Sequence, residues 1–198
     1  MTGQQKLEAL ARRKLLIRAR DLEPAGIARS ELRRAMDRNI LTYVSRGVYR
    51  FANAEPTAHD VMIEACLRVP QGVVCLLSSL NFHELGTQSP HQIWMAIDVK
   101  ARKPPSSDLP LKIVRFSGIA LADGVETHQT AAGEIRVYCA AKTVADCFKY
   151  RNKTGLDVAL EALRDYIHNR TGTIDEIWKY AKVCRVSKVM RPYLEAMI

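Results

Sequence analysis

The sequence has little glycine and proline, no long apolar run and no closely spaced cysteine pair. Gly and Pro number 10 and 8 in 198 residues, which excludes a collagen-like chain, and 47% hydrophobic residues with 26% charged residues argue against intrinsic disorder. The apolar run at residues 73–77 is far shorter than the roughly 20 residues that cross a bilayer. Residues 1–14 also lack the apolar stretch of a secretory signal. We therefore expect a globular, cytoplasmic protein with no membrane partner.

The cysteines are far apart, and none forms a C-x-x-C pair with another. Because each lies among apolar neighbours, we expect reduced, buried thiols that pack as small hydrophobic side chains, with neither disulfides nor a zinc site. These residues are Cys66, Cys75, Cys139, Cys147 and Cys184.

No catalytic or cofactor motif stands out. The phosphate-binding loop, the dinucleotide-binding glycine pattern and the nucleophile-elbow pattern are all absent from the sequence. His83 and Glu84 resemble half of a zinc-protease helix, but the second histidine is missing because position 87 is Thr. We therefore predict a protein that is not an enzyme and that holds no metal or cofactor.

Two pairs of charged residues leave alternatives open. Asp98 and Lys100 have the D-x-K spacing of metal-dependent nucleases, so a Mg²⁺-dependent nuclease with a DNA-targeting N-terminal domain remains an alternative. Lys142 and Asp146 have the i, i+4 spacing of an ordinary surface ion pair on a helix, and this is the interpretation we favour for them.

The net charge of +9 is unevenly distributed along the chain. Residues 1–55 hold 12 Lys and Arg against 6 Asp and Glu, whereas the remaining residues hold 18 against 15. A compact basic segment beside a nearly balanced body is typical of a surface that binds phosphates. This distribution favours nucleic acid as a partner.

The basic segment has the order of a helix-turn-helix. Residues 7–16 supply the apolar side chains of a first helix, residues 19–25 are short and partly helical, and Gly26 permits a turn. A second helix over residues 29–38 carries an apolar stripe. Its opposite face shows Arg29, Ser30, Arg33 and Arg34. We expect base contacts from Arg29, Ser30 and Arg33, and phosphate contacts from Arg33 and Arg34, in the major groove of double-stranded DNA.

A β-hairpin is predicted directly after this second helix. Residues 42–45 and 48–51 are β-branched and aromatic, and Arg46 and Gly47 separate them. A hairpin at this place is the wing of a winged helix-turn-helix. We expect Arg46 and Arg50 to contact the sugar-phosphate backbone, and Tyr49 completes the predicted DNA-binding set. The bounds of this DNA-binding domain are predicted as residues 1–52.

A mixed α/β domain over residues 57–198 follows a short linker at residues 53–56. A helix is predicted over 57–69, and residues 73–85 fit either a buried strand or the start of a helix. Strands are predicted at 92–97, 111–116, 125–128 and 135–138, and a basic, proline-rich surface loop at 100–108. From residue 140 the periodicity is helical, with Thr173 as a helix cap. The fold class is thus α+β, with a winged helix-turn-helix followed by an α/β domain that ends in a helical subdomain.

Several stretches resemble the AbiEi-type antitoxins of type IV, abortive-infection toxin–antitoxin systems that act in phage defence. They are residues 46–50, 73–80, 82–83, 91–94, 114–118 and above all 142–153 leading into 155–163. The resemblance spans nearly the whole chain. It implies a transcriptional repressor whose winged helix binds inverted repeats in its own promoter. It also implies a C-terminal domain that opposes a nucleotidyltransferase-like toxin, directly or indirectly, and it implies no catalytic centre or cofactor.

The toxin-neutralising surface is predicted from charge. Lys149, Arg151 and Lys153 form a cationic cluster near residue 150, although a solvated helix face explains the same pattern. A transcription factor whose larger domain senses a small ligand is a further alternative.

Overall fold

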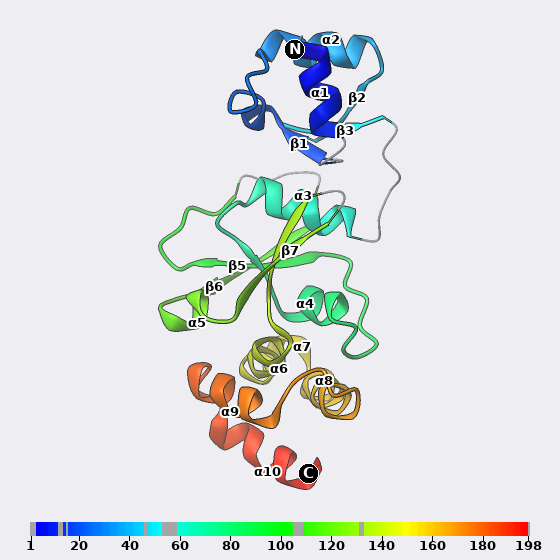
Figure 1. The fold of residues 1–198 in the computed structure, drawn as a ribbon. Coiled ribbons are helices and arrows are strands. Elements are labelled where there is room, and N and C mark those ends of the chain that lie inside the picture. Colours follow the sequence, from blue (N-terminus) through cyan, green and yellow to red (C-terminus); the bar gives the residue numbers. More distant parts are fainter. Residues whose placement is uncertain are drawn as a thin grey trace. The chain divides into compact units, whose positions relative to one another are not determined.

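The computed structural model describes residues 3–11, 14, 16–45, 47–52, 59–104, 109–130 and 133–197 (Figure 1). The chain divides into two compact units. The first comprises residues 1–70, 106–109 and 128–135, and the second comprises residues 71–105, 110–127 and 136–198. The domain bounds 1–52 and 57–198 stay a prediction.

The first unit combines short helices with a three-stranded antiparallel sheet. Its elements are α1 (Gly3–Ala11), β1 (Leu16–Arg18), the 3-10 helix η1 (Ala19–Asp21), α2 (Arg29–Asp37), β2 (Leu41–Ser45), β3 (Val48–Phe51) and α3 (Asp60–Arg68). The sheet order is β1-β3-β2, and β2 and β3 form the predicted hairpin. Gly26 and Gly47 both have positive φ, which suits the turns that precede α2 and join the hairpin strands.

One prediction for this unit is wrong. The first helix was expected to continue to residue 16, but α1 ends at Ala11 and Leu16 begins strand β1, where it pairs with Arg50 of β3. Leu16 and Ile17 are buried at 1% and 0% exposure, so their apolar side chains fill the core from a strand. A short apolar run has no periodicity that separates the two structures, and pairing with β3 decides between them.

The core of the first unit is small and draws on every predicted apolar stripe. Helix α2 contributes its apolar side to this core and leaves its arginine-bearing side exposed. The buried members are Leu7, Ile17, Leu22, Ile27, Ala35, Leu41 and Phe51.

The second unit contains most of a five-stranded mixed sheet, of which residues 128–129 and 134–135 are counted with the first unit. The strands are β4 (Val73–Val74), β5 (Ile93–Asp98), β6 (Leu111–Phe116), β7 (Val125–Gln129) and β8 (Glu134–Tyr138), in the order β6-β5-β4-β8-β7. Strands β5 and β6 run parallel, as do β4 and β8, whereas β4 and β5 are antiparallel. The segment at residues 73–85 contains both alternatives, because strand β4 is followed at once by helix α4 (Leu76–Phe82).

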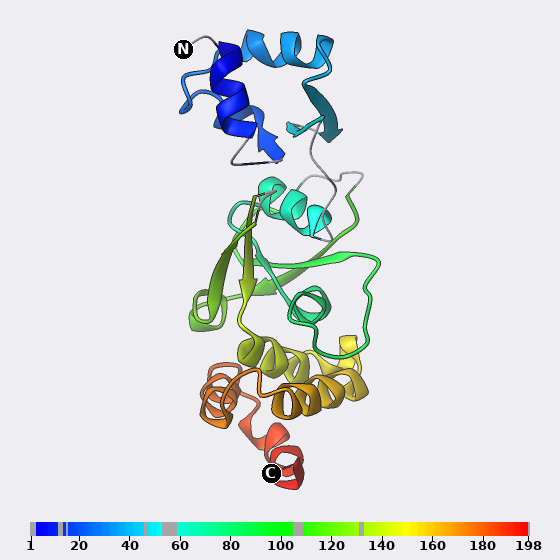
Figure 2. The ribbon, with the colours of Figure 1, turned by 45° about the vertical axis from the view of Figure 1, so that its right-hand side comes forward.

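Helices dominate the rest of this unit, as the periodicity predicts. They are α5 (Ile119–Ala122), α6 (Ala140–Lys149), α7 (Arg151–Thr154), α8 (Leu156–His168), α9 (Ile174–Val183) and α10 (Ser187–Met197). The last five gather beside the sheet (Figures 1 and 2), and α6 is in contact with α4, α8 and α9. Thr173 caps α9 as predicted, because its hydroxyl accepts the N–H of Glu176. The fold is therefore α+β.

Four of the five cysteines are buried, and the fifth, Cys139, is half-buried. All five are free thiols in this structure. Within the described residues, no helix is both long enough and apolar enough to span a bilayer.

Candidate functional site

Helix α2 presents a basic surface. Arg29, Ser30, Arg33 and Arg34 are all exposed, while Ala35 on the opposite side is buried in the core of the first unit. The structure thus brings four predicted DNA-contacting residues together on one exposed helix. A helix with a free cationic side can approach the major groove without unpacking its own core.

Two of these arginines have acidic neighbours. Arg34 Nη1 lies 2.6 Å from Glu31 Oε1, and Arg29 Nη2 lies 3.9 Å from Glu23 Oε2. The Arg29 and Glu23 side chains are 72% and 75% exposed, and exposed pairs of this kind contribute little, about 0–1 kcal/mol. Phosphate can therefore compete for the Arg29 guanidinium. The Arg34 pair is closer, and its Glu31 side chain is only 21% exposed, so a phosphate contact by Arg34 has to displace Glu31. Within the described part of the chain, Arg33 makes no ion pair.

Two residues of the β2–β3 hairpin were predicted to contact DNA in addition to Arg50. Arg46 lies outside the described residues. Tyr49 is half-buried, and its ring meets that of Tyr43 edge-on at 5.9 Å between centroids. Tyr43 is 61% exposed, so the pair places an aromatic surface on the hairpin.

Arg50 was expected to have a free side chain that contacts phosphate, but in the structure its guanidinium group is held in an ion pair. Its Nη2 lies 2.7 Å from Asp60 Oδ2 at the start of α3, and the two side chains are only 28% and 11% exposed. Releasing this guanidinium would leave a largely buried carboxylate without its cation, which is costly. The ion pair makes Arg50 a link between β3 and α3, which the sequence could not reveal because Asp60 lies beyond the predicted domain.

The cationic residues near residue 150 lie at the junction of α6 and α7. Lys149 and Lys153 are exposed, and each ammonium group lies over an aromatic ring, that of Phe116 at 5.9 Å and that of Tyr150 at 5.6 Å. Arg151 is half-buried and donates from Nη1 to the carbonyl of Phe148 at 3.0 Å. Two of the three predicted side chains therefore face solvent.

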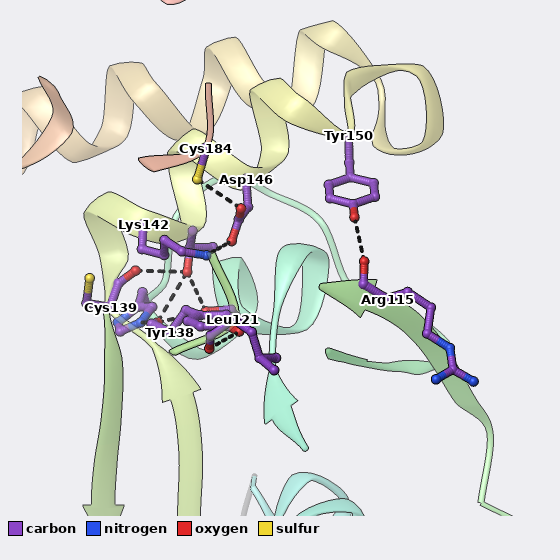
Figure 3. Close-up of polar contacts among 11 residues, drawn as sticks. Arg115, Leu121, Tyr138, Cys139, Lys142, Asp146, Tyr150 and Cys184 are labelled. Carbon is purple, nitrogen blue, oxygen red and sulfur yellow. Dashed lines mark hydrogen bonds and ion pairs between the residues drawn. The ribbon is translucent and has the colours of Figure 1, made fainter. Parts of the chain in front are cut away.

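The surface-pair prediction for Lys142 and Asp146 is wrong. Both side chains are 0% exposed, and Lys142 Nζ lies 2.5 Å from Asp146 Oδ2 (Figure 3). The ammonium group also lies 3.9 Å from the centroid of the Tyr138 ring, and Cys184 Sγ donates to Asp146 Oδ1 at 3.1 Å. The buried ion pair thereby joins α6 to the sheet and to the residue after α9.

Burial sets the ionisation of this cluster. It raises the pKa of Asp146, an effect that the adjacent Lys142 ammonium opposes, and it raises the pKa values of Cys147 and Cys184. Both thiols therefore stay protonated at neutral pH, and Cys184 can act as the hydrogen-bond donor. Such thiols have the inert character of core residues.

The sequence of α6 does not indicate this burial. Val144, Ala145, Cys147 and Phe148 lie on one side of the helix, and Lys142 and Asp146 lie on the other, which is the pattern of an amphipathic helix with an exposed polar side. The i, i+4 spacing by itself does not separate a surface pair from a core pair.

The nuclease-like pair has a local structural role. Asp98 Oδ1 accepts the backbone N–H of Lys100 at 2.7 Å, which closes the turn after β5. Across the described residues, no group of three or more His, Cys, Asp or Glu side chains is placed to hold a metal ion. His83 contacts the Tyr138 carbonyl through Nε2 at 2.7 Å.

A comparison with protein-family models gives a match in the first unit. Residues 5–52 match the family model described as "Transcriptional regulator, AbiEi antitoxin". This segment is similar to the AbiEi regulators. The match contains α2 and the β2–β3 hairpin, so the exposed arginines lie inside the matched regulator segment. The resemblance to AbiEi antitoxins is thus confirmed for residues 5–52, and for the stretches beyond residue 52 it stays a prediction.

A structural comparison extends over most of the chain. The crystal structure of the RV2827C protein from Mycobacterium tuberculosis superposes with a TM-score of 0.57 at 14% identity, covering 92% of this chain and 72% of that one. At this identity the likeness shows a shared fold. No curated protein matches the chain.

Proposed function

We propose that this protein represses transcription of its own operon and also acts as the antitoxin of a nucleotidyltransferase-like toxin. The observation that carries the proposal is the exposed cationic side of α2 within the matched regulator segment. A winged helix-turn-helix formed by residues 1–52 places α2 in the major groove at inverted repeats, with the β2–β3 hairpin as its wing. Residues 57–198 form the antitoxin domain of this cytoplasmic protein.

Arg29, Ser30 and Arg33 contact base edges in this proposal, and Arg33 and Arg34 contact phosphates. Guanidinium groups bind guanine edges in a bidentate manner, and each such contact contributes about 1–3 kcal/mol of discrimination between bases. Tyr49 and Arg46 approach the backbone from the hairpin. Arg50 supports the hairpin through Asp60 and makes no phosphate contact as long as this pair persists.

A comparison of promoter duplexes tests the DNA half. Fluorescence anisotropy is measured with the inverted repeat from the chain's own promoter and with a scrambled duplex of equal length. Arg29→Ala is expected to reduce the affinity ratio between the two duplexes about tenfold, because it removes a base contact. Arg191→Ala, an exposed arginine on α10, is the matched control and leaves the ratio unchanged. An unchanged ratio in Arg29→Ala rejects base recognition by this residue.

Co-expression with the toxin encoded next to this chain tests the second part of the proposal, its action as an antitoxin. Wild-type chain is expected to restore growth of cells that express the toxin, and the charge reversal Lys149→Glu/Lys153→Glu is expected to abolish rescue while repression of a promoter reporter persists. Lys182→Glu/Lys188→Glu reverses two exposed lysines on α9 and α10 and serves as control. Full rescue by the first variant removes these lysines from the neutralising surface.

A further inference from the structure

Strand β6 forms one end of the five-stranded sheet. It pairs with β5 in parallel register, from Ile93 opposite Leu111 to Asp98 opposite Phe116. The carbonyl of Phe116 accepts the N–H of Val99 at 3.0 Å, so the backbone groups of residue 116 point toward β5. Backbone direction alternates along a strand, and the groups of residues 111, 113 and 115 therefore point away from the sheet.

A side-chain contact supports this orientation. The Tyr150 hydroxyl donates to the carbonyl of Arg115 at 3.2 Å (Figure 3), which agrees with a carbonyl that points away from β5. Among the described residues, Leu111 and Ile113 have no such partner for their outward N–H and carbonyl groups, and both residues are only half-buried. An open strand edge of this kind can accept a further strand.

Three lysine side chains lie near this edge, and each ammonium group lies over an aromatic ring. The pairs are Lys112 over Trp94 at 5.7 Å, Lys149 over Phe116 at 5.9 Å and Lys153 over Tyr150 at 5.6 Å. The rings of Phe116 and Tyr150 stack at 5.4 Å, so Lys149 and Lys153 lie on one aromatic pair, whereas Lys112 lies on the separate ring of Trp94. Stacking restricts the lysine side chains and lowers the entropy cost of binding an anion.

These cations are not held by ion pairs within the described part of the chain. Lys112, Lys149 and Lys153 make no ion pair there, in contrast to Arg34 and Arg50 of the first unit. Arg115 is exposed, and its Nη1 donates to the carbonyls of Asp98, Val99 and Ala101, which leaves its remaining N–H groups available. The charged side chains of β6 itself, Lys112 and Arg115, are therefore both positive.

The positive charge of the β6 edge indicates which class of partner can bind to it. A second copy of this edge would bring like charges together, which disfavours self-pairing. The outward carbonyl oxygens of Leu111 and Ile113 repel phosphates, whereas an extended peptide satisfies both the carbonyl and the N–H groups. Exposed Val99 (51%) and Ile119 (64%) supply apolar contacts beside the end of β5 and β6.

We infer that the β6 edge binds an acidic, extended segment of a partner protein as an added strand, with its carboxylates beside Lys112, Arg115 and Lys149. The inference deepens the antitoxin half of the proposed function, because it rests on a protein partner and names the chemistry of the segment that is bound. It does not depend on DNA binding.

Anisotropy titration of the full-length chain with a labelled probe tests the inference. The probe is a short peptide in which glutamate alternates with valine, and a second peptide of equal charge has proline in place of every valine. The first is expected to bind and the second to bind at least about tenfold more weakly, because proline lacks the N–H that strand addition needs. Hydrogen exchange is expected to show protection of the Ile113 amide only with the first peptide.

Variants separate the edge from general electrostatics. Lys112→Glu is expected to weaken binding of the alternating peptide about tenfold, because it places a like charge beside the carboxylates. Lys188→Glu on α10 makes the same change of net charge and leaves binding unchanged, and thermal melting checks that both variants are folded. The DNA-binding variant Arg33→Ala/Arg34→Ala retains peptide binding, so failure of the DNA proposal is distinguishable from failure of this one.

Each contrary outcome overturns the inference. Absence of peptide binding, equal binding of the proline peptide, or an equal reduction in Lys188→Glu excludes strand addition at this edge. If Lys112→Glu instead weakens binding of duplex DNA and no peptide binds, the edge is a nucleic-acid contact.

Discussion

At the scale of single residues, the buried ion pair between Lys142 and Asp146 is expected to have a strong effect on the free energy of unfolding when one partner is removed. Two charges at 0% exposure have lost their hydration, and they are compensated by one another, by the Tyr138 ring and by the Cys184 thiol. Within the described residues, no buried side-chain nitrogen or oxygen lacks a hydrogen-bond partner. Removal of one partner is therefore far more damaging than replacement of both.

Asp146→Ala is expected to lower the free energy of unfolding by about 3–5 kcal/mol, because it leaves the Lys142 ammonium buried without its counter-charge. The double variant Lys142→Met/Asp146→Leu is expected to recover most of that stability. Urea denaturation monitored by circular dichroism measures both, with the exposed Arg191→Ala as a control that changes stability by less than about 0.5 kcal/mol. A double variant no more stable than Asp146→Ala would contradict this explanation.

A second residue-scale prediction concerns pH. The backbone N–H of Thr173 donates to Glu176 at 2.8 Å, and this bond lowers the pKa of Glu176 below its ordinary 4.5. A lowered pKa means that the ionised carboxylate stabilises the folded state above pH 4.5, and that this contribution is lost as pH falls through the folded-state pKa. In urea unfolding at a series of pH values, the stability difference between wild type and Glu176→Gln should be constant near neutrality and shrink in acid. A difference independent of pH rejects the ionised cap.

At the scale of elements, Arg50 and Asp60 join strand β3 to helix α3 within the first unit. Arg18 adds a second connection, because its Nη1 donates to the carbonyl of Leu67 near the end of α3, at 3.3 Å. Both arginines lie in the segment that the sequence assigns to DNA binding. The structure uses them to position α3, so net charge overstates the number of guanidinium groups available to phosphates.

A double-mutant cycle on Arg50→Met and Asp60→Asn is expected to give a coupling energy of about 1–2 kcal/mol, between the values for exposed and buried pairs. Asp60→Asn is expected to leave affinity for duplex DNA unchanged, because Arg50 has a structural role. Denaturation supplies the coupling energy and anisotropy supplies the affinity. A coupling energy near zero, together with altered DNA affinity, would return Arg50 to the DNA-contacting set.

At the scale of the whole molecule, the sequence predicted the helices and strands better than it predicted which distant segments pair or pack with one another. Strands β5 to β8, helix α2 and the Thr173 cap follow from periodicity and capping, which are local properties. Strand β1 and the burial of Lys142 depend on pairing and packing with distant segments, here β3 and the residues around Cys184. The same distinction holds for the site, because the exposure of Arg33 follows from α2 alone, whereas the engagement of Arg50 requires Asp60.

The distribution of charge is also a whole-molecule property. A net charge of +9 attracts polyanions from any direction, but binding at one place requires cations that no carboxylate neutralises. Arg33 meets that condition on α2, and Lys112, Lys149 and Lys153 meet it along the β6 edge, in each case among the described residues. We therefore propose a separate anionic partner for each of the two units.

The most direct test of the central claim is the salt dependence of binding to promoter DNA. For Arg33→Ala/Arg34→Ala, the slope of log K against log salt concentration is expected to become shallower by about 0.9 for each phosphate that the variant no longer neutralises. The control Arg164→Ala/Arg191→Ala removes the same charge from exposed positions on α8 and α10 and should retain the wild-type slope. An unchanged slope and affinity in the α2 variant would show that this helix does not contact DNA.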